Sequence, residues 1–365
     1  MKVSVPTVFI DKEIVMNNIK KIVEKAKKNN LVFRPHFKTH QSVEVGKWFK
    51  ESGVDCITVS SVRMARCFAK AGWKDITIAF PTNILEIKEI NKLAKKIKLN
   101  LLVTNLETTK FLQQNIETQT DIWIEIDVGY HRSGIRWDNF KEILVLAQEI
   151  EKSSKLSFAG ILTHSGHSYN SKNISEIISI HEESLERLTS IKKQLLENGL
   201  KQVKISIGDT PTASVAENLE EVDELRPGNF VFYDLKMLKI NACSEKDIAI
   251  RVACPVVSKN KEGLELVIYG GAIHFSKDVL LDEEGRYIYG YLTEEKNNEW
   301  GPIIKSSYIS SLSQEHGIII TDKNHFDKIN IGDIVLIVPV HSCLTMNVMG
   351  NFRLTTGEKY VALCK

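Results

Sequence analysis

A lysine lies among two histidines and an arginine in the stretch RPHFKTH, residues 34–40, directly after the apolar residues 31–33. An amine held in a partly desolvated site has a lowered pKa and can form a Schiff base with a carbonyl compound. Lys38 is therefore a candidate catalytic lysine. An ordinary lysine on the protein surface is the alternative interpretation of the same residue.

Two later turns could bind a phosphate group. The stretch GDTPTAS, residues 208–214, combines a glycine with small hydroxyl residues, and RPGN, residues 226–229, is a second turn of small residues. Such turns offer backbone N–H groups and hydroxyls to a phosphate, although each is also typical of a plain turn. A reactive lysine combined with two phosphate-sized turns fits a phosphorylated aldehyde cofactor, pyridoxal 5'-phosphate (PLP).

A third motif could hold a metal. In PVHSCLT, His341 and Cys343 are two residues apart after the apolar run 333–340. On an extended segment residues i and i+2 share one face, and an imidazole and a thiolate that point the same way suit zinc. The alternative is that His341 caps a strand end and Cys343 is a small buried apolar residue.

The elements that carry these residues alternate along the first two thirds of the chain. Eight near-continuous apolar runs, typical of a buried parallel sheet, are separated by segments with helical periodicity. The runs cover residues 31–37, 56–60, 75–80, 98–104, 121–128, 155–163, 203–207 and 222–233. This pattern predicts an α/β fold, a (β/α)8 TIM barrel, whose active residues gather at the carboxyl ends of the strands.

From about residue 245 onward β-rich runs dominate and helical spacing is scarce. We expect two domains: a PLP-binding barrel over residues 10–240, and a mostly β domain over 241–365 that carries the metal site. An apolar N-terminal segment, residues 1–10, is expected to add a strand to the second domain.

Composition narrows the class of protein. The 365-residue chain has a formal net charge of +2, which argues against a dedicated nucleic-acid surface. No apolar run is long enough to span a membrane, and the N-terminus shows no signal-peptide pattern. The six cysteines show no CxxC pairing and are expected to be reduced thiols, so the expected location is cytoplasmic.

Taken together, the motifs resemble a known family. RPHFKTHQ, DVGYHRSGI, GILTHSGHSY, SIGDTPTAS, ELRPGNFVFYD and PVHSCLT occur in the order found in the D-serine dehydratase / D-threonine aldolase family, over residues 5–350. Members of that family are alanine-racemase-like, fold type III PLP enzymes. The resemblance implies a small D-amino-acid substrate and a homodimer.

The resemblance also assigns roles. Lys38 matches the lysine that binds the cofactor covalently, and Arg132 matches the arginine that faces its phenolic oxygen. Tyr169 matches a tyrosine of the cofactor pocket. Arg226 stands where alanine racemases place an arginine against the pyridine nitrogen. Asp127 is expected to orient Arg132.

The remaining matches concern the phosphate and the metal. Thr210, Gly228 and Asn229 fall in the phosphate-binding turns. His341 and Cys343 match a divalent-metal position, at which D-threonine aldolases typically have aspartate in place of the cysteine. The cysteine favours zinc and dehydration.

The resemblance thus implies a dehydratase that converts D-serine or a related D-3-hydroxy amino acid to a 2-oxo acid and ammonia. D-Threonine aldolase and alanine-type racemase activities remain alternatives, as does a non-catalytic PLP carrier, which would lack the second domain. The segment Tyr269-Gly270-Gly271-Ala272-Ile273-His274 departs from the family pattern. This departure leaves the identity of the substrate open.

Overall fold

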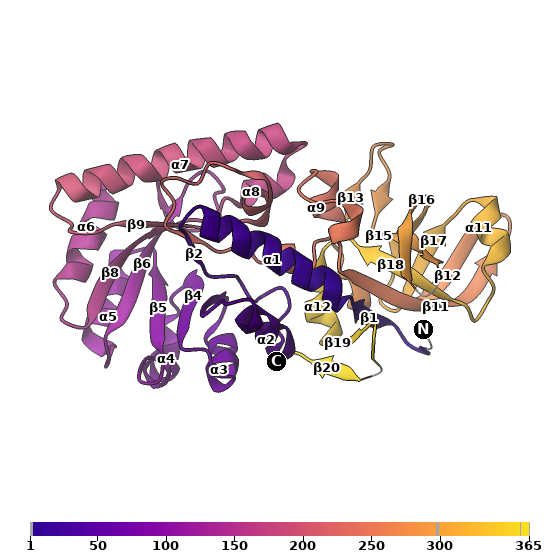
Figure 1. The fold of residues 1–365 in the computed structure, drawn as a ribbon, viewed down its shortest axis with the longest axis horizontal. Helices are drawn as coiled ribbons and strands as arrows, with labels where there is room; N and C mark the ends of the chain where they lie inside the picture. The colour runs from indigo at the N-terminus through magenta and orange to yellow at the C-terminus, as the bar shows by residue number, and fades with distance from the viewer. Residues whose placement is uncertain (1–2, 297–298, 358, 365) are drawn as a thin grey trace. The chain divides into compact units, whose positions relative to one another are not determined.

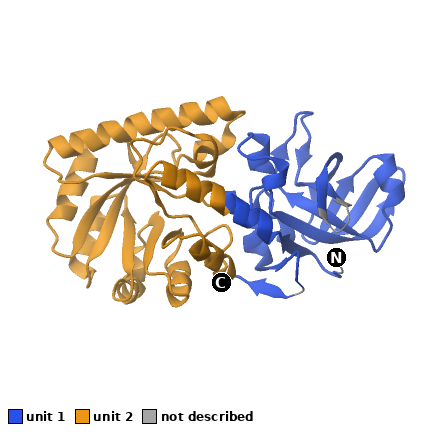
Figure 2. Cartoon of the chain, in the orientation of Figure 1, with its two compact units in different colours: residues 1–18, 229–363 blue, residues 19–228, 364–365 orange. Residues whose placement is uncertain are grey.

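The computed structural model describes residues 3–296, 299–357 and 359–364. The chain divides into two compact units, drawn in two colours in Figure 2. The barrel unit comprises residues 19–228 and 364–365, and the β unit comprises residues 1–18 and 229–363.

The barrel unit contains eight parallel strands in the order β2-β10-β9-β8-β6-β5-β4-β3. Their bounds are β2 (Val32–Phe33), β3 (Cys56–Val59), β4 (Asp75–Pro81), β5 (Lys98–Val103), β6 (Thr120–Asp127), β8 (Leu156–Leu162), β9 (Lys204–Ile207) and β10 (Glu224–Leu225). A short strand β7 (Ile135–Arg136) pairs with β6. The predicted alternating α/β barrel is therefore confirmed.

The barrel closes at the stretch that carries Lys38. An isolated parallel bridge joins His36 to Thr58 of strand β3. Phe37 donates its backbone N–H to the Thr58 carbonyl, and Thr58 donates to the Pro35 carbonyl, both at 2.9 Å. Strand β2 has two residues where the sequence predicts a strand over 31–37, because Pro35 has no N–H for a regular ladder.

The last barrel strand is also shorter than predicted. The sequence predicts a strand over 222–233, whereas β10 covers two residues and a 3-10 turn, η3 (Asn229–Val231), follows. Pro227 removes a backbone donor, and His36 uses the Pro227 carbonyl as its acceptor at 2.8 Å. The chain after β10 therefore closes against the Lys38 stretch instead of extending the sheet.

Helices follow the strands and lie outside them (Figure 1). Several begin at a side chain that accepts backbone N–H groups of the first turn, namely Ser42, Ser61, Asn105 and Asn173. Their bounds are α1 (Lys12–Lys28), α2 (Val43–Glu51), α3 (Val62–Lys70), α4 (Ile87–Ala94), α5 (Leu106–Asn115), α6 (Phe140–Glu151), α7 (Ile174–Glu197) and α8 (Thr210–Val215).

The β unit is built on one sheet in the order β12-β17-β16-β15-β18-β11-β1-β19-β20. An additional pairing of β12 with β11 joins six of its strands into a ring, which leaves fewer open edges. The bounds are β1 (Thr7–Ile10), β11 (Ile250–Asn260), β12 (Glu265–Tyr269), β15 (Gly290–Lys296), β16 (Glu299–Leu312), β17 (His316–Ile320), β18 (Ile334–Pro339), β19 (Asn351–Leu354) and β20 (Tyr360–Ala362).

Three elements of this unit bear on function. The N-terminal strand β1 pairs antiparallel with β11 and parallel with β19. Two short helices, α10 (Ala272–Phe275) and α12 (Ser342–Met349), contact each other. Thr345 of α12 donates its hydroxyl to the Phe275 carbonyl of α10 at 3.2 Å.

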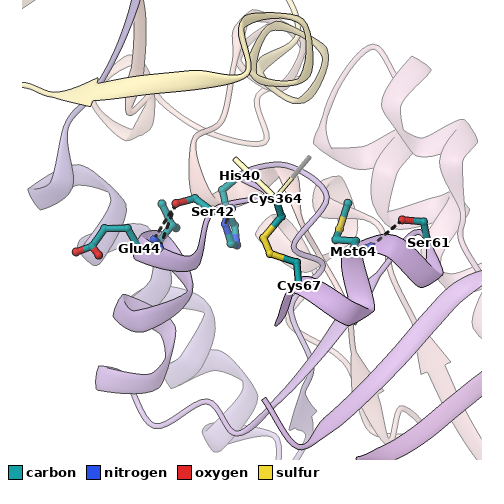
Figure 3. The surroundings of a disulfide bond; sticks show 8 residues. His40, Ser42, Glu44, Ser61, Met64, Cys67 and Cys364 are labelled. Carbon is teal, nitrogen blue, oxygen red and sulfur yellow. Dashed lines mark hydrogen bonds between the residues drawn. A yellow bond between two sulfur atoms is a disulfide. The ribbon is translucent and has the colours of Figure 1, made fainter. Parts of the chain in front are cut away.

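The cysteine prediction is partly wrong, because Cys67 of α3 forms a disulfide with Cys364 (Figure 3). Their sequence separation of 297 residues gave no spacing signal that could suggest the pair. Cys364 donates its backbone N–H to the Gln41 carbonyl at 2.7 Å, which holds it near α2 and α3. The other cysteines, Cys56, Cys243, Cys254 and Cys343, lie outside disulfides, as expected.

Within the described part of the chain, no helix is both long enough and apolar enough to cross a membrane.

Candidate active site

A cavity of about 350 Å³ lies at the carboxyl ends of the barrel strands. Three basic residues suggested by the sequence line it, namely Lys38, Arg132 and Arg226. Leu102 and Leu162 also line it and pack with Trp123 in a buried cluster. The cavity therefore combines an apolar side with positive charge, and its volume suits a small anionic ligand.

Lys38 reaches the cavity because the chain turns directly after the barrel closure. Its backbone N–H donates to Nδ1 of His36 at 3.3 Å. Burial and the positive charges of Lys38 and Arg226 hold the pKa of His36 well below its usual range. His36 is therefore neutral, and it lines the cavity beside the lysine.

Arg226 is buried, with its guanidinium held on two sides. Nε donates to the Ser206 hydroxyl and Nη2 donates to the Thr163 carbonyl, both at 2.6 Å. Burial lowers the pKa of Arg226 to about 10, against the opposing effect of Glu224, so the group stays charged at neutral pH. A Cβ at Gly208 would lie 2.7 Å from Nη1 of Arg226, so the glycine makes room for the guanidinium.

His164, which follows β8, also lines the cavity. Its Nδ1 is 2.6 Å from the Gly208 carbonyl, so this nitrogen must carry the proton. Burial and the charges of Lys38 and Arg132 hold the pKa of His164 well below its usual range. The neutral ring therefore keeps Nε2 as a hydrogen-bond acceptor.

Arg132 is paired with Glu125, not with Asp127 as expected. Its Nη2 lies 3.7 Å from Oε1 of Glu125, and the same oxygen accepts the Ser133 hydroxyl at 2.9 Å. Asp127 instead accepts the backbone N–H groups of Gly129 and His131 and contacts the His131 ring at 3.0 Å.

Glu125 was missed by the sequence analysis, although a charged residue inside the apolar run 121–128 was the available signal. It is buried on β6, two residues after Trp123 and thus on the same face of the strand. Oε2 is buried and has no partner in the described part of the structure.

The predicted phosphate turn at Thr210 lies at the start of helix α8. The backbone N–H of Thr210 donates to the Tyr169 hydroxyl at 3.1 Å, which brings two predicted cofactor residues together. The Thr210 hydroxyl oxygen is buried and has no partner among the described residues. Gly228, in the second predicted turn, lies against the Lys38 stretch, since a Cβ there would be 2.8 Å from the His36 carbonyl oxygen.

Asn229 belongs to a hydrogen-bond network of the β unit. Its amide nitrogen donates to Oδ2 of Asp234 at 2.6 Å and to the Ser342 hydroxyl at 3.2 Å, and lies 3.8 Å from Sγ of Cys343. Ser342 in turn donates its backbone N–H to Oδ2 of Asp234 at 2.9 Å. The buried carboxylate of Asp234 thus joins the turn at 229 to the segment that contains His341 and Cys343.

His341 and Cys343 come together, but not for the reason given from the sequence. The segment is not extended, because His341 is the N-cap of helix α12 and Cys343 lies in its first turn. Burial lowers the pKa of His341, yet hydrogen bonds with Asp278 and Cys343 outweigh burial and raise it to about 10. Asp278 contacts Nδ1 of His341 and was not suggested by the sequence analysis.

Other histidines play different parts. His40 packs among Phe37, Phe49 and Phe68 and accepts the Ser42 N–H at 3.1 Å, so its role is structural. His274 accepts the Gly271 N–H at 3.0 Å and so turns the backbone at the start of α10.

Comparisons with known proteins agree with this architecture. The family description "Alanine racemase, N-terminal domain" matches residues 10–236, which is more than half of the chain. The chain belongs to the alanine racemase N-terminal domain family. A second description, "Putative serine dehydratase domain", matches residues 249–355.

Individual relatives cover nearly the whole chain. D-serine dehydratase of Dictyostelium discoideum is 28% identical over 98% of this chain and 94% of its own length. The 3-hydroxy-D-aspartate aldolase of Paracoccus denitrificans is 26% identical over 95% and 87%. The solved structure of D-threo-3-hydroxyaspartate dehydratase from Delftia sp. HT23 has a TM-score of 0.91 at 25% identity, over 99% and 98% of the two chains. The predicted relation to the dehydratase and aldolase family is confirmed, and the relatives' names confirm an enzyme of the lyase class.

The barrel residues fit the PLP that characterises fold type III enzymes. The cavity offers Lys38 as the amine, Arg132 and Arg226 as cations, and an apolar side made by Leu102 and Leu162. The buried hydroxyl of Thr210, which has no partner among the described residues, is a donor that a phosphate oxygen would satisfy.

The β unit contains the two residues that the sequence analysis assigns to a metal, His341 and Cys343. The described part of the chain contains no group of three or more His, Cys, Asp or Glu residues arranged to hold a metal. The donor set of His341 and Cys343 nevertheless has the chemistry of a zinc ligand pair. Two protein ligands would leave the other positions to water and substrate.

Proposed function

We propose that this protein is a PLP- and divalent-metal-dependent dehydratase of D-3-hydroxy amino acids, with D-serine as the first candidate substrate. The products would be a 2-oxo acid and ammonia. The observation that carries the proposal is the position of Lys38 in a cavity whose other polar walls include Arg132, Arg226, Glu125 and two neutral histidines.

PLP, when bound to Lys38, supplies an electron sink for negative charge that develops at the substrate's Cα. The cations Arg132 and Arg226 would hold its anionic groups, and the hydroxyls of Thr210 and Tyr169, with the turn at Gly228, would hold its phosphate. The amine of Lys38 would accept the Cα proton. With the Cα proton on Lys38, the β-hydroxyl would leave as water, and hydrolysis of the remaining C–N bond would give the 2-oxo acid and ammonia.

The neutral state of the cavity histidines supports this division of roles. His36 and His164 are weak bases and do not compete with Lys38 for the Cα proton, since burial and the surrounding cations hold both pKa values well below the usual range. The acceptor nitrogen of His164 can instead orient a hydroxyl or an amine.

A divalent metal, for which we propose zinc, would be held by His341 and Cys343 and supplies a Lewis acid for the departing hydroxyl. A thiolate favours zinc over a harder metal such as manganese. The thiol of Cys343 also favours dehydration over aldol cleavage, because D-threonine aldolases typically have aspartate in place of this cysteine. Aldolase activity remains the second candidate, since one relative is named a 3-hydroxy-D-aspartate aldolase.

We further propose a homodimer in the cytoplasm. Helices α10 and α12 contact each other and leave Ile273, Leu344 and Val348 exposed, an apolar surface that a second copy could cover. Light scattering during size-exclusion chromatography gives the mass in solution, and fractionation of cells gives the location.

The deciding experiment is product analysis with purified, PLP-loaded protein. D-serine and D-threonine are offered separately, with a chelator, without it, and after zinc is added back. We expect pyruvate or 2-oxobutyrate plus ammonia, which should be lost on chelation and recovered with zinc.

Three other outcomes would contradict parts of the proposal. Glycine plus an aldehyde would show an aldolase, and loss of chirality without breakdown would show a racemase. Turnover that a chelator leaves unchanged would remove the metal from the mechanism. A Lys38→Ala protein that keeps the yellow absorbance of the lysine-bound cofactor would refute the role of Lys38.

A further inference from the structure

The ring of His341 is held by a carboxylate 63 residues earlier in the chain. Nδ1 of His341 contacts Oδ2 of Asp278, and both side chains are about a quarter exposed. Nζ of Lys236 lies 3.8 Å from the same carboxylate oxygen. All three residues belong to the β unit.

The backbone before Asp278 holds this residue in place. Ser276 has a positive φ of 69°, a conformation that residues other than glycine rarely adopt. Its hydroxyl accepts the backbone N–H of Asp278 at 3.2 Å. A strained residue that persists two positions before a carboxylate indicates that the surrounding structure fixes the place of that carboxylate.

The contact decides which imidazole nitrogen can act as a ligand. A carboxylate can only accept, so Nδ1 of His341 keeps its proton, and Nε2 is the nitrogen that gives up its proton to a metal and binds it. Metal-ligating histidines usually donate their second ring N–H to a carboxylate or carbonyl, which fixes the ring and strengthens the ligand.

Asp278 is not placed as a ligand itself. Together with His341 and Cys343 it would make a group of three, yet no such group among the described residues is arranged to hold a metal. Its oxygen is turned to the ring nitrogen and to Lys236 instead.

We propose that Asp278 is the positioning residue of the metal site: it orients His341 and fixes its tautomer so that Nε2 is the ligand atom. The proposal rests on the metal part of the proposed function. Two carboxylates then hold different parts of this segment. Asp234 fixes the backbone at Ser342, and Asp278 fixes the imidazole one residue earlier.

The test measures metal binding directly, by competition of the PLP-loaded protein with a chromophoric chelator for zinc. Asp278→Ala should bind zinc about 10- to 100-fold more weakly than the wild type. Asp278→Asn, which keeps the volume but loses the charge, should fall between the two. The Asp322→Asn protein is the matched control, because Asp322 makes the same kind of contact with His325, at 2.6 Å, within the same unit.

Absorption of the cobalt-substituted proteins separates a positioning role from a ligand role. The cobalt–thiolate bands should keep their energies in Asp278→Asn, since the ligand set is unchanged. A change in band energies would show that Asp278 binds the metal, and equal zinc affinity in wild type and Asp278→Ala would show that it does not act on the site. Either result overturns the proposal, as does an equal loss of affinity in Asp322→Asn.

A failure of the metal part of the proposed function would give a different result from a failure of the proposal for Asp278. If the wild-type protein itself takes up no stoichiometric zinc or cobalt, His341 and Cys343 are not a metal site. The proposal for Asp278 then falls together with the metal part of the proposed function, whereas the yellow absorbance of bound PLP would still report on Lys38.

Discussion

The disulfide between Cys67 and Cys364 gives the sharpest test of the fold, because it joins residues 297 positions apart. The perturbation is the double variant Cys67→Ser/Cys364→Ser, which removes the cross-link and leaves no new unpaired thiol. The matched control is Cys243→Ser, which changes a cysteine outside the disulfide.

The expected magnitude follows from the loop that the bond closes. A cross-link stabilises a protein mainly by removing loop-closure entropy from the unfolded chain, and a loop of 297 residues gives roughly 6 kcal/mol in the simplest chain model. Measured disulfides typically contribute about 2–5 kcal/mol, so the chain-model value is an upper bound. We expect the double variant to lose about 2–5 kcal/mol of unfolding free energy.

Two assays check this expectation. Thiol titration of the unfolded, unreduced protein should find four of the six cysteines reactive, and the urea midpoint of the double variant should fall while that of Cys243→Ser stays near the wild type. Six reactive thiols would show that the bond does not form in the purified protein. An unchanged midpoint would show that it forms but does not constrain the unfolded chain.

Three further predictions concern the site and its support. Burial lowers the pKa of His40 to about 3 in the folded protein, whereas a histidine of the unfolded chain titrates near pH 6.5. The unfolded chain therefore binds one more proton as the pH falls below about 6.5, so the free energy of unfolding should decrease by about 1.4 kcal/mol per pH unit, and His40→Asn should flatten that slope. Gly228→Ala should cost about 1–3 kcal/mol and impair PLP loading, because its Cβ would lie 2.8 Å from the His36 carbonyl, whereas Gly357→Ala, with no atom of the described residues within 4 Å, should leave both unchanged. Thr210→Val should weaken PLP binding about 10-fold in a spectrophotometric titration and leave the unfolding of the cofactor-free protein unchanged, because its hydroxyl has no partner to lose among the described residues.

The barrel could be predicted because its signal is local. Buried parallel strands require near-continuous apolar runs, and the helices between them require amphipathic periodicity. Each element can therefore be predicted from its own residues alone. The sequence also places three basic residues at one end of the barrel, Lys38, Arg132 and Arg226. This was possible because the carboxyl ends of parallel strands all lie at the same end of a barrel. The strands near Pro35 and Pro227 are shorter than predicted, because an apolar pattern does not show where a proline lacks the backbone N–H that a strand needs.

The partners of these residues could not be predicted in the same way. Glu125 rather than Asp127 contacts Arg132 because of how the turn after β6 folds back. Asp278 contacts His341 across 63 residues, and the Cys67–Cys364 disulfide joins helix α3 to the C-terminal segment, so both pairs depend on the packing of elements that are distant in the sequence.

Asn229 shows that a residue of a predicted phosphate turn can use its side chain for other contacts. The turn RPGN suggests a phosphate site in which the asparagine contributes, yet the described donor contacts of its amide go to Asp234, Ser342 and Cys343. The remaining side-chain atom, Oδ1, is a buried acceptor and cannot bind a phosphate oxygen. What Asn229 can offer a phosphate is therefore its main-chain N–H, and its side chain instead stabilises the segment of His341 and Cys343. An Asn229→Asp change would place a second carboxylate against Asp234, so it should disturb that segment first and any phosphate contact only as a consequence.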